Sequence, residues 1–164
     1  MMHAAPSIKT VTLDDASIIR RSAEVEHERR VALTDITHTN EVELLGASLT
    51  PPYDLFISVR DNRLTLRFTD TEGAQADITL PLAPYRGIIK DYFLMCEQYY
   101  DAIKHSPGDR LQTLDMARRG VHNEGSEMLQ EQLADRLKMD FSTARRLFTL
   151  ICVLHISHSD RLTI

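Results

Sequence analysis

The chain has 164 residues, of which 43% are hydrophobic and 26% charged, and its formal net charge is −5. These proportions are typical of a globular protein and argue against intrinsic disorder, and the length corresponds to one domain. The acidic balance also argues against non-specific binding to nucleic acid, because such binding needs a basic surface.

The apolar segments and the two cysteines of the chain predict where the protein is located. The first residues carry neither the basic region nor the apolar run of a secretory signal. The longest apolar run, Leu147 to Ile156, is about half as long as a membrane span. Cys96 and Cys152 lie in apolar helical stretches, where we expect reduced core thiols. We therefore expect a cytoplasmic protein without a membrane segment.

The N-terminal part predicts a strand followed by a surface helix. Residues 7–13 are rich in β-branched side chains, which favour a strand. From residue 22 to about residue 39, one apolar stripe recurs at helical spacing. Its members are Val25, Ala32, Leu33 and Ile36. Because this stripe is narrow, the helix should lie at the surface.

The clearest β signal follows a linker at residues 46–52. Residues 55–60 and 63–68 alternate apolar and polar side chains, and the Asp-Asn pair between them can form a tight hairpin turn. A second turn at residues 71–73 leads to a third alternating segment, residues 76–80. The pattern predicts an antiparallel meander with one apolar face, and such a sheet needs a helical cover.

Residues 84–103 predict the strongest helix of the chain. Pro84 suits the first helical turn, and a broad apolar face lies opposite a charged one. We expect this helix to cover the sheet. Leu94 projects from the polar side, where it is either an exposed leucine or a second contact surface.

Two further helices are predicted after residue 105. Ser106 and Pro107 suit the start of a helix that extends over residues 111–137, with Gly120 and Gly125 as candidate breaks. From Asp140 the last helix becomes apolar on nearly every side, so we expect it to be the buried central helix.

Together these elements predict an α+β protein, with an antiparallel sheet of three to four strands covered by a mostly helical C-terminal half. We expect a single domain over residues 1–164. Residues 7–82 would hold the strands and the first helix, residues 84–156 the helical half, and residues 157–164 a loose tail.

The densest set of functional side chains lies between Arg118 and Glu127. If the helix continues through Gly120, Arg118 and His122 fall within its apolar arc. They then need partners, because an unpaired buried charge is costly. The carboxylates available on neighbouring helices are Glu24, Glu28, Asp91 and Glu97.

If the helix instead stops at Gly120, Asn123 becomes an N-cap. The exposed amides of residues 124–126 would then form a small anion site framed by Arg118 and Arg119. Both geometries can bind phosphate or carboxylate, and the alternative to both is an ionic network that holds three helices together. The candidate ligand-binding residues are Arg118, Arg119, His122, Asn123, Glu124 and Ser126, and the candidates for a structural network are Glu28, Asp91 and Glu97.

Signals for metal binding and catalysis are weak. Glu24 and His27 have the (i, i+3) spacing of carboxylate-bridged bundles, but those sites use two such pairs. Neither cysteine has a partner at ligand spacing. The chain contains no Gly-x-Ser-x-Gly elbow, Gly-rich phosphate loop or kinase motif set. We expect no metal and no cofactor. The absence of these catalytic motifs favours a non-enzymatic protein over an enzyme.

Several blocks of sequence together resemble a known family. They are residues 26–29, 88–93 with 96–97, 115–129 and 143–155. Over nearly its whole length the chain resembles an alphaproteobacterial family that is classed only as an uncharacterised protein family. Because that family has no assigned activity, the resemblance implies no catalytic residues.

Two functional hypotheses follow. The leading one is a non-enzymatic cytosolic protein that acts through a protein partner or a homo-oligomer, because catalytic motifs are missing and Leu94 is an additional apolar position. The rival is a binding protein or enzyme for an anionic small molecule, phosphorylated or carboxylate, that uses residues 118–127. An open cleft at Arg118 and His122 would favour the rival, whereas a closed helix interface would favour a structural role.

Overall fold

The structure, a computed structural model, describes residues 6–15, 22–105 and 108–162, with side chains in the last helix described as far as His155. The α+β prediction is confirmed, because strands and helices are both present and the helices dominate the C-terminal half. In chain order the elements are β1 (Ile8–Leu13), α1 (Ala23–His38), β2 (Val42–Leu44), β3 (Tyr53–Arg60), β4 (Arg63–Thr69), β5 (Gln75–Pro81), the 3₁₀ helix η1 (Ala83–Tyr85), α2 (Arg86–His105), α3 (Asp109–Leu133), β6 (Leu137–Met139) and α4 (Phe141–Leu162).

The predicted meander is confirmed. Strands β3, β4 and β5 are neighbours and antiparallel, and the apolar side chains of Ile57, Leu66 and Ile78 lie opposite one another across them. Asp61 and Asn62 form the turn between β3 and β4 with φ values of 53° and 60°. Positive φ at both central residues is the conformation of the tight hairpin turn that best matches the twist of two strands.

The sheet is mixed rather than antiparallel throughout. Strand β1 completes the order β1-β3-β4-β5 and lies parallel to β3. Parallel neighbours need a long crossover, and α1 lies in the chain between these two strands. Two strands of three residues each, β2 and β6, were not expected; they pair with each other in a second sheet. Segments this short carry no recognisable alternation.

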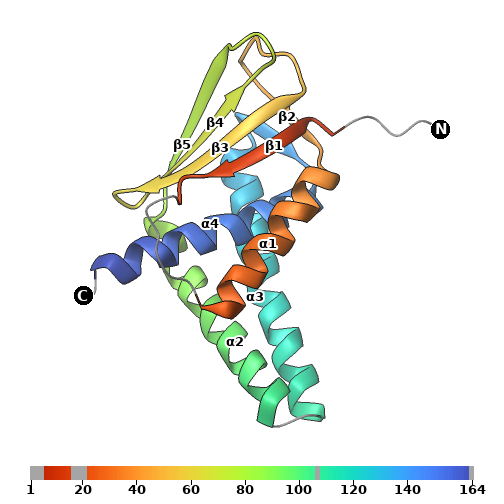
Figure 1. The fold of residues 1–164 in the computed structure, drawn as a ribbon, viewed down its shortest axis with the longest axis vertical. Coiled ribbons are helices and arrows are strands. Elements are labelled where there is room, and N and C mark those ends of the chain that lie inside the picture. Colours follow the sequence, from red (N-terminus) through yellow and green to blue (C-terminus); the bar gives the residue numbers. More distant parts are fainter. Residues whose placement is uncertain (1–5, 16–21, 106–107, 163–164) are drawn as a thin grey trace, which may run out of the picture.

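Helix α4 is the buried central helix, as predicted, and it passes beneath the apolar face of the four-stranded sheet (Figure 1). The expectation that residues 84–103 would cover the sheet is wrong. Helix α2 packs against α3 instead, and the two form an antiparallel hairpin that extends away from the sheet (Figure 1). The reason is that α4 is apolar on nearly every side from Leu147 to Leu154 and can face the sheet and the other helices at once. The single apolar face of α2 packs against α3 instead.

Side-chain hydrogen bonds hold both ends of helix α1. The side chain of Ser22 accepts a hydrogen bond from the Val25 backbone N–H at the start of the helix. After its end, the side-chain amide of Asn40 donates to the carbonyls of Ile36 and Ile8 and accepts from the Ile8 N–H. Asn40 therefore joins α1 to β1 and places one face of α1 against α4.

Helix α3 is continuous through both glycines and ends at Leu133. Gly108 stands at its N-cap, while the predicted cap at Ser106 and Pro107 lies outside the described residues. Helix α4 continues to Leu162, into the segment expected to form a loose tail. None of the described helices combines the length and the apolar composition that a membrane span requires.

Candidate functional site

The continuity of α3 decides between the two geometries open from the sequence. Because the helix does not break at Gly120, Asn123 is an internal helical residue and not an N-cap. The backbone amides of residues 124–126 then serve the helix itself, so the anion site predicted at those amides is wrong. Gly125 does allow a close approach, but the group that approaches is the ring of Phe148.

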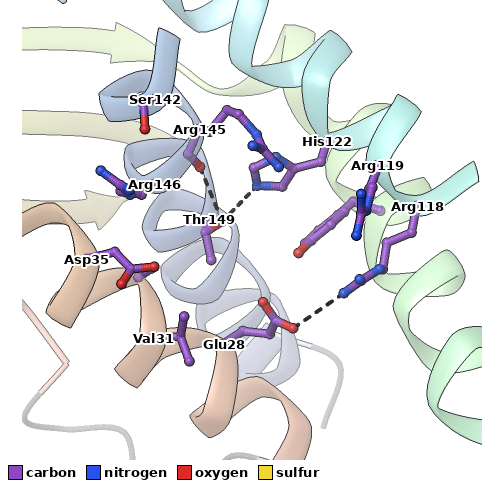
Figure 2. A pocket seen from close by; sticks show the side chains of 12 residues that line it. Glu28, Val31, Asp35, Arg118, Arg119, His122, Ser142, Arg145, Arg146 and Thr149 are labelled. Carbon is purple, nitrogen blue, oxygen red and sulfur yellow. Dashed lines mark hydrogen bonds and ion pairs between the residues drawn. The ribbon is translucent and has the colours of Figure 1, made fainter. Parts of the chain in front are cut away.

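Arg118, Arg119 and His122 line an open cleft of about 440 Å³ between α1, α3 and α4 (Figure 2). They form the wall contributed by α3. The opposite wall is α1, with Glu28, Val31, Ala32 and Asp35, and α4 contributes Ser142, Arg145, Arg146 and Thr149. One side chain of α2, Tyr92, completes the lining. Arg119 and Arg145 are exposed at this cleft, whereas Arg118 is half-buried and His122 is buried in its lining.

Arg118, which lines the cleft, is the centre of an ionic network. Its Nη2 lies 2.6 Å from Asp115 Oδ1 and its Nη1 lies 3.7 Å from Glu28 Oε1. The Tyr100 hydroxyl donates to the same Glu28 oxygen at 2.6 Å, and the ring centroid of Tyr99 lies 4.3 Å from the guanidinium carbon. This set joins α1, α2 and α3, so part of the predicted helix-joining network exists.

His122 is uncharged and held by Thr149. The two atoms His122 Nε2 and Thr149 Oγ1 are 2.7 Å apart, and Thr149 Oγ1 donates to the Arg145 carbonyl at 3.2 Å. The threonine has one hydrogen for these two contacts, so either tautomer of the imidazole completes a hydrogen bond with Thr149. Burial, together with the nearby charges of Arg145 and Arg118, lowers the pKa of His122 to about 4. The imidazole is therefore neutral at pH 7.

The surroundings of His122 keep it in place. The Tyr92 and Phe148 ring centroids lie 5.0 and 5.3 Å from the imidazole centroid. Ser126 donates to the His122 backbone carbonyl at 2.7 Å. His122 thus supplies a polar but uncharged surface, and the charge of the cleft comes from its arginines.

Positive charge exceeds negative charge in the cleft. Among the described residues its lining includes four arginines and two carboxylates, Glu28 and Asp35. Arg119 is paired with Asp115 at 3.2 Å, and Arg146 donates to the Thr39 carbonyl. Within the described part of the chain, neither Arg145 nor Arg146 pairs with a carboxylate. The lining of the cleft is therefore basic although the whole chain has a net charge of −5.

The remaining candidates from the 118–127 segment lie outside the cleft. Glu124 is exposed, and Ser126 is fully buried, where its hydroxyl caps the His122 carbonyl. The Asn123 side-chain oxygen is buried without a hydrogen-bond partner in the structure. The helical period explains the position of Glu124, which turns away from the side of α3 that residues 118, 119 and 122 share. Ser126 keeps that side but lies one turn further along the helix, where it is fully buried.

Two of the three carboxylates suggested for a structural network lie elsewhere. Glu28 contacts Arg118 as described, but Asp91 and Glu97 are exposed on α2. The second carboxylate of the network is Asp115, one turn before Arg118 on α3 itself. The two arginines next to Asp115 hold the pKa of its carboxyl below the ordinary range, Arg118 by the closest hydrogen bond.

The residues that sequence reasoning missed come from α4 and α1: Asp35, Ser142, Arg145, Arg146 and Thr149. A signal existed for the two adjacent arginines, because they are the last charges before α4 becomes wholly apolar. That they face the 118–122 segment depends on how α3 packs on α4, which no local pattern reveals.

Other chemistry has less support in the described part of the chain. It contains no group of three or more histidine, cysteine, aspartate or glutamate side chains that could hold a metal ion. Both cysteines are buried and free. Burial raises the pKa of Cys96 to about 11 and raises the pKa of Cys152 as well. Thiols that stay protonated at neutral pH are poor nucleophiles.

Comparison with known proteins identifies a family and close relatives. The model of Uncharacterised protein family (UPF0262) matches residues 5–157. A UPF0262 protein of Azorhizobium caulinodans is 50% identical over 147 residues, which are 88% of this chain and 91% of the relative. UPF0262 proteins of Rhizobium johnstonii and Roseobacter denitrificans are 49% and 45% identical, over 88% and 90% of this chain and 92% and 96% of theirs. No solved structure matches the chain.

Proposed function

We propose that this chain, which belongs to the uncharacterised protein family UPF0262, binds a small anionic solute in the cleft between α1, α3 and α4. The observation that carries the proposal is the surplus of positive charge there. Arg145 has no carboxylate partner in the described part of the chain, although its side chain is exposed at the cleft. A guanidinium placed in this way is suited to bind a carboxylate or a phosphate through two parallel hydrogen bonds.

The shape and rigidity of the cleft support the same proposal. Its volume of about 440 Å³ lies in the lower part of the range for small-molecule sites, roughly 300–1,000 Å³. Arg118 and His122 are held by Asp115, Glu28 and Thr149, so the wall contributed by α3 is formed before a ligand arrives. A pre-formed site loses little conformational entropy on binding.

The proposal concerns binding and assigns no reaction. The histidine of the cleft is neutral and hydrogen-bonded, and the cysteines are buried with raised pKa values. The cytoplasmic location predicted from the sequence stays a prediction, and the proposal is compatible with it.

A ligand screen followed by calorimetry tests the proposal. The purified chain would be screened by thermal shift against inorganic phosphate, phosphorylated metabolites, nucleotides and carboxylates, and each hit titrated calorimetrically. We expect Arg145→Gln to weaken binding of a true ligand by about tenfold or more, which equals ~1.4 kcal/mol. Affinity should also fall as salt is added, because exposed charges are screened.

Arg63→Gln is the matched control, because Arg63 is an exposed arginine on β4 that does not line the cleft. It should bind every hit as the unmodified chain does. The proposal fails if no anion binds, or if Arg145→Gln and Arg63→Gln bind the same ligand with equal affinity.

A protein partner or a second copy of the chain is the second candidate, and exposed apolar side chains favour it. Leu94 is 45% exposed, as the sequence indicated, and Ile103 and Met116 on the same helical hairpin are 47% and 67% exposed. Light scattering after size exclusion tests this candidate. If the unmodified chain is a dimer that Leu94→Ser and Met116→Ser convert to a monomer, the hairpin is an interface; a monomer at high concentration contradicts self-association.

A further inference from the structure

The negative and the positive charges of the cleft come from different helices. Its two carboxylates, Glu28 and Asp35, are both on α1, whereas its four arginines are on α3 and α4 (Figure 2). The cleft therefore has an acidic side, α1, and a basic side, α3 with α4. The two sides touch where Glu28 meets Arg118 and where Arg146 donates to the Thr39 carbonyl after α1. A purely anionic ligand would satisfy the basic side alone.

Each side includes a charge with no ionic partner in the described part of the chain. On the acidic side, Glu28 is occupied by Tyr100 and Arg118, but Asp35 is exposed and forms no ion pair. On the basic side, Arg145 is likewise exposed and forms no ion pair. Both side chains line the cleft, yet no salt bridge within 4.0 Å joins them. The space between them is therefore suited to a ligand that carries both signs of charge.

The position of Asp35 on its helix also needs an explanation. Helix α1 ends at His38, so Asp35 stands in the last turn. A negative charge there is opposed by the helix dipole. Local helix stability therefore does not account for an aspartate at this position, which lines the cleft.

We propose that the cleft binds a small zwitterion of the amino-acid type, an α-amino acid or a short peptide. This proposal rests on the proposed function and specifies its ligand class. The carboxylate lies against Arg145, and the ammonium group donates hydrogen bonds to Asp35. Val31 and Ala32, which separate the two carboxylates of α1, give the ligand's carbon atoms an apolar surface.

Matched ligands test the proposal by removing one charge at a time. The twenty L-amino acids and alanyl-alanine would each be titrated into the full chain by calorimetry. For the strongest binder, the N-acetyl derivative keeps the carboxylate and loses the ammonium group, while the amide keeps the ammonium group and loses the carboxylate. We expect both derivatives to bind about tenfold or more weakly than the zwitterion.

Variants of the chain test which wall of the cleft each end of the ligand contacts. Arg145→Gln should weaken the zwitterion and its N-acetyl derivative alike. Asp35→Asn should weaken the zwitterion by about tenfold but leave the N-acetyl derivative unchanged or bound more tightly, because a nearby negative charge has been removed. Asp91→Asn, an exposed aspartate of α2 outside the cleft, is the matched control and should change neither affinity.

The outcomes separate this proposal from the broader one. If zwitterion and N-acetyl derivative bind equally, or if Asp35→Asn weakens both to the same extent, the zwitterion proposal is overturned while anion binding stands. The same holds if only phosphates or amine-free carboxylates bind in a manner that depends on Arg145. If no anion of either panel binds, both proposals fail. Circular dichroism of each variant confirms that a lost affinity is not a lost fold.

Discussion

The ring of Phe148 on α4 lies directly against the backbone of Gly125 on α3. A β-carbon added at Gly125 would stand 2.2 Å from Phe148 Cζ and 2.5 Å from Cε1, distances at which atoms cannot coexist. Phe148 is itself fully buried and packs edge-on against the imidazole of His122. Because Gly125 has no side chain, α3 and α4 come close together, and Phe148 can pack against His122 in the lining of the cleft.

Gly125→Ala should destabilise the protein even though alanine favours helices. The added methyl group would force the Phe148 ring out of a packed core, an overpacking that typically costs about 1–3 kcal/mol. Gly120→Ala on the same helix is the control, because a β-carbon there meets nothing. It should stabilise by about 0.5–1 kcal/mol. Urea denaturation measures both, and a stabilising Gly125→Ala would contradict the close packing.

The stability of the protein should fall as His122 becomes protonated in the unfolded chain. The ordinary histidine pKa is about 6.5, and burial lowers the pKa of His122 to about 4 in the folded state. Between these values the unfolded chain binds a proton that the folded chain does not, so the free energy of unfolding decreases from pH 6.5 toward pH 4. The loss at pH 4.5 should be roughly 2–3 kcal/mol.

Denaturation at pH 7 and pH 4.5 measures this effect. His122→Asn removes the titrating group, so the difference between the two pH values should shrink by that amount. His27→Asn is the control, because His27 is exposed on α1. Equal pH dependence in the two variants would contradict the buried neutral imidazole.

Glu28→Gln should destabilise the helical part of the molecule by about 1–2 kcal/mol. The side chains of Glu28 and Arg118 are only 20% and 19% exposed, so the loss of one charge leaves the other poorly solvated. Glu24→Gln, on the same helix, provides the comparison. Glu24 faces Lys104 at 3.8 Å with both side chains substantially exposed, and such pairs contribute about 0–1 kcal/mol. Thermal denaturation that ranks Glu24→Gln as the more damaging change would refute the role given to Glu28.

The hairpin turn offers a test that is independent of the cleft. Asn62 has φ 60°, a conformation that glycine adopts without strain and alanine does not. Asn62→Gly should leave stability unchanged or raise it, and Asn62→Ala should lower it by about 1–2 kcal/mol. Equal denaturation midpoints for the two variants would mean that the turn has a different geometry.

The local features of the fold could be predicted from the sequence. Alternation over residues 55–68 indicated the hairpin, and the uninterrupted apolar surface after Leu147 indicated the central helix. Both signals belong to a single segment, so they require no knowledge of neighbours. The parallel pairing of β1 with β3 and the pairing of β2 with β6 were missed, because each joins segments far apart in the chain.

The candidate site was likewise predictable only where its signal lay within one segment. Arg118 and His122 were recognised because two polar residues on an apolar arc need partners, and their partners Glu28 and Thr149 lie on α1 and α4. The basic residues of α4 were not recognised as part of the site. Their role depends on where α4 crosses α3, which is set by packing at Gly125 and Phe148 rather than by any spacing in one segment.

The double hydrogen bond from Asn40 to Ile8 has a consequence for self-association. Strand β1 is an edge strand, and the N–H and C=O groups at its free edge could template a strand of another molecule. At Ile8 both groups are already bonded to one side-chain amide. The opposite edge, β5, exposes Asp77 and ends in Pro81, which has no N–H to offer. Both borders of the sheet thus carry groups that disfavour the addition of a foreign strand, a protection against aggregation.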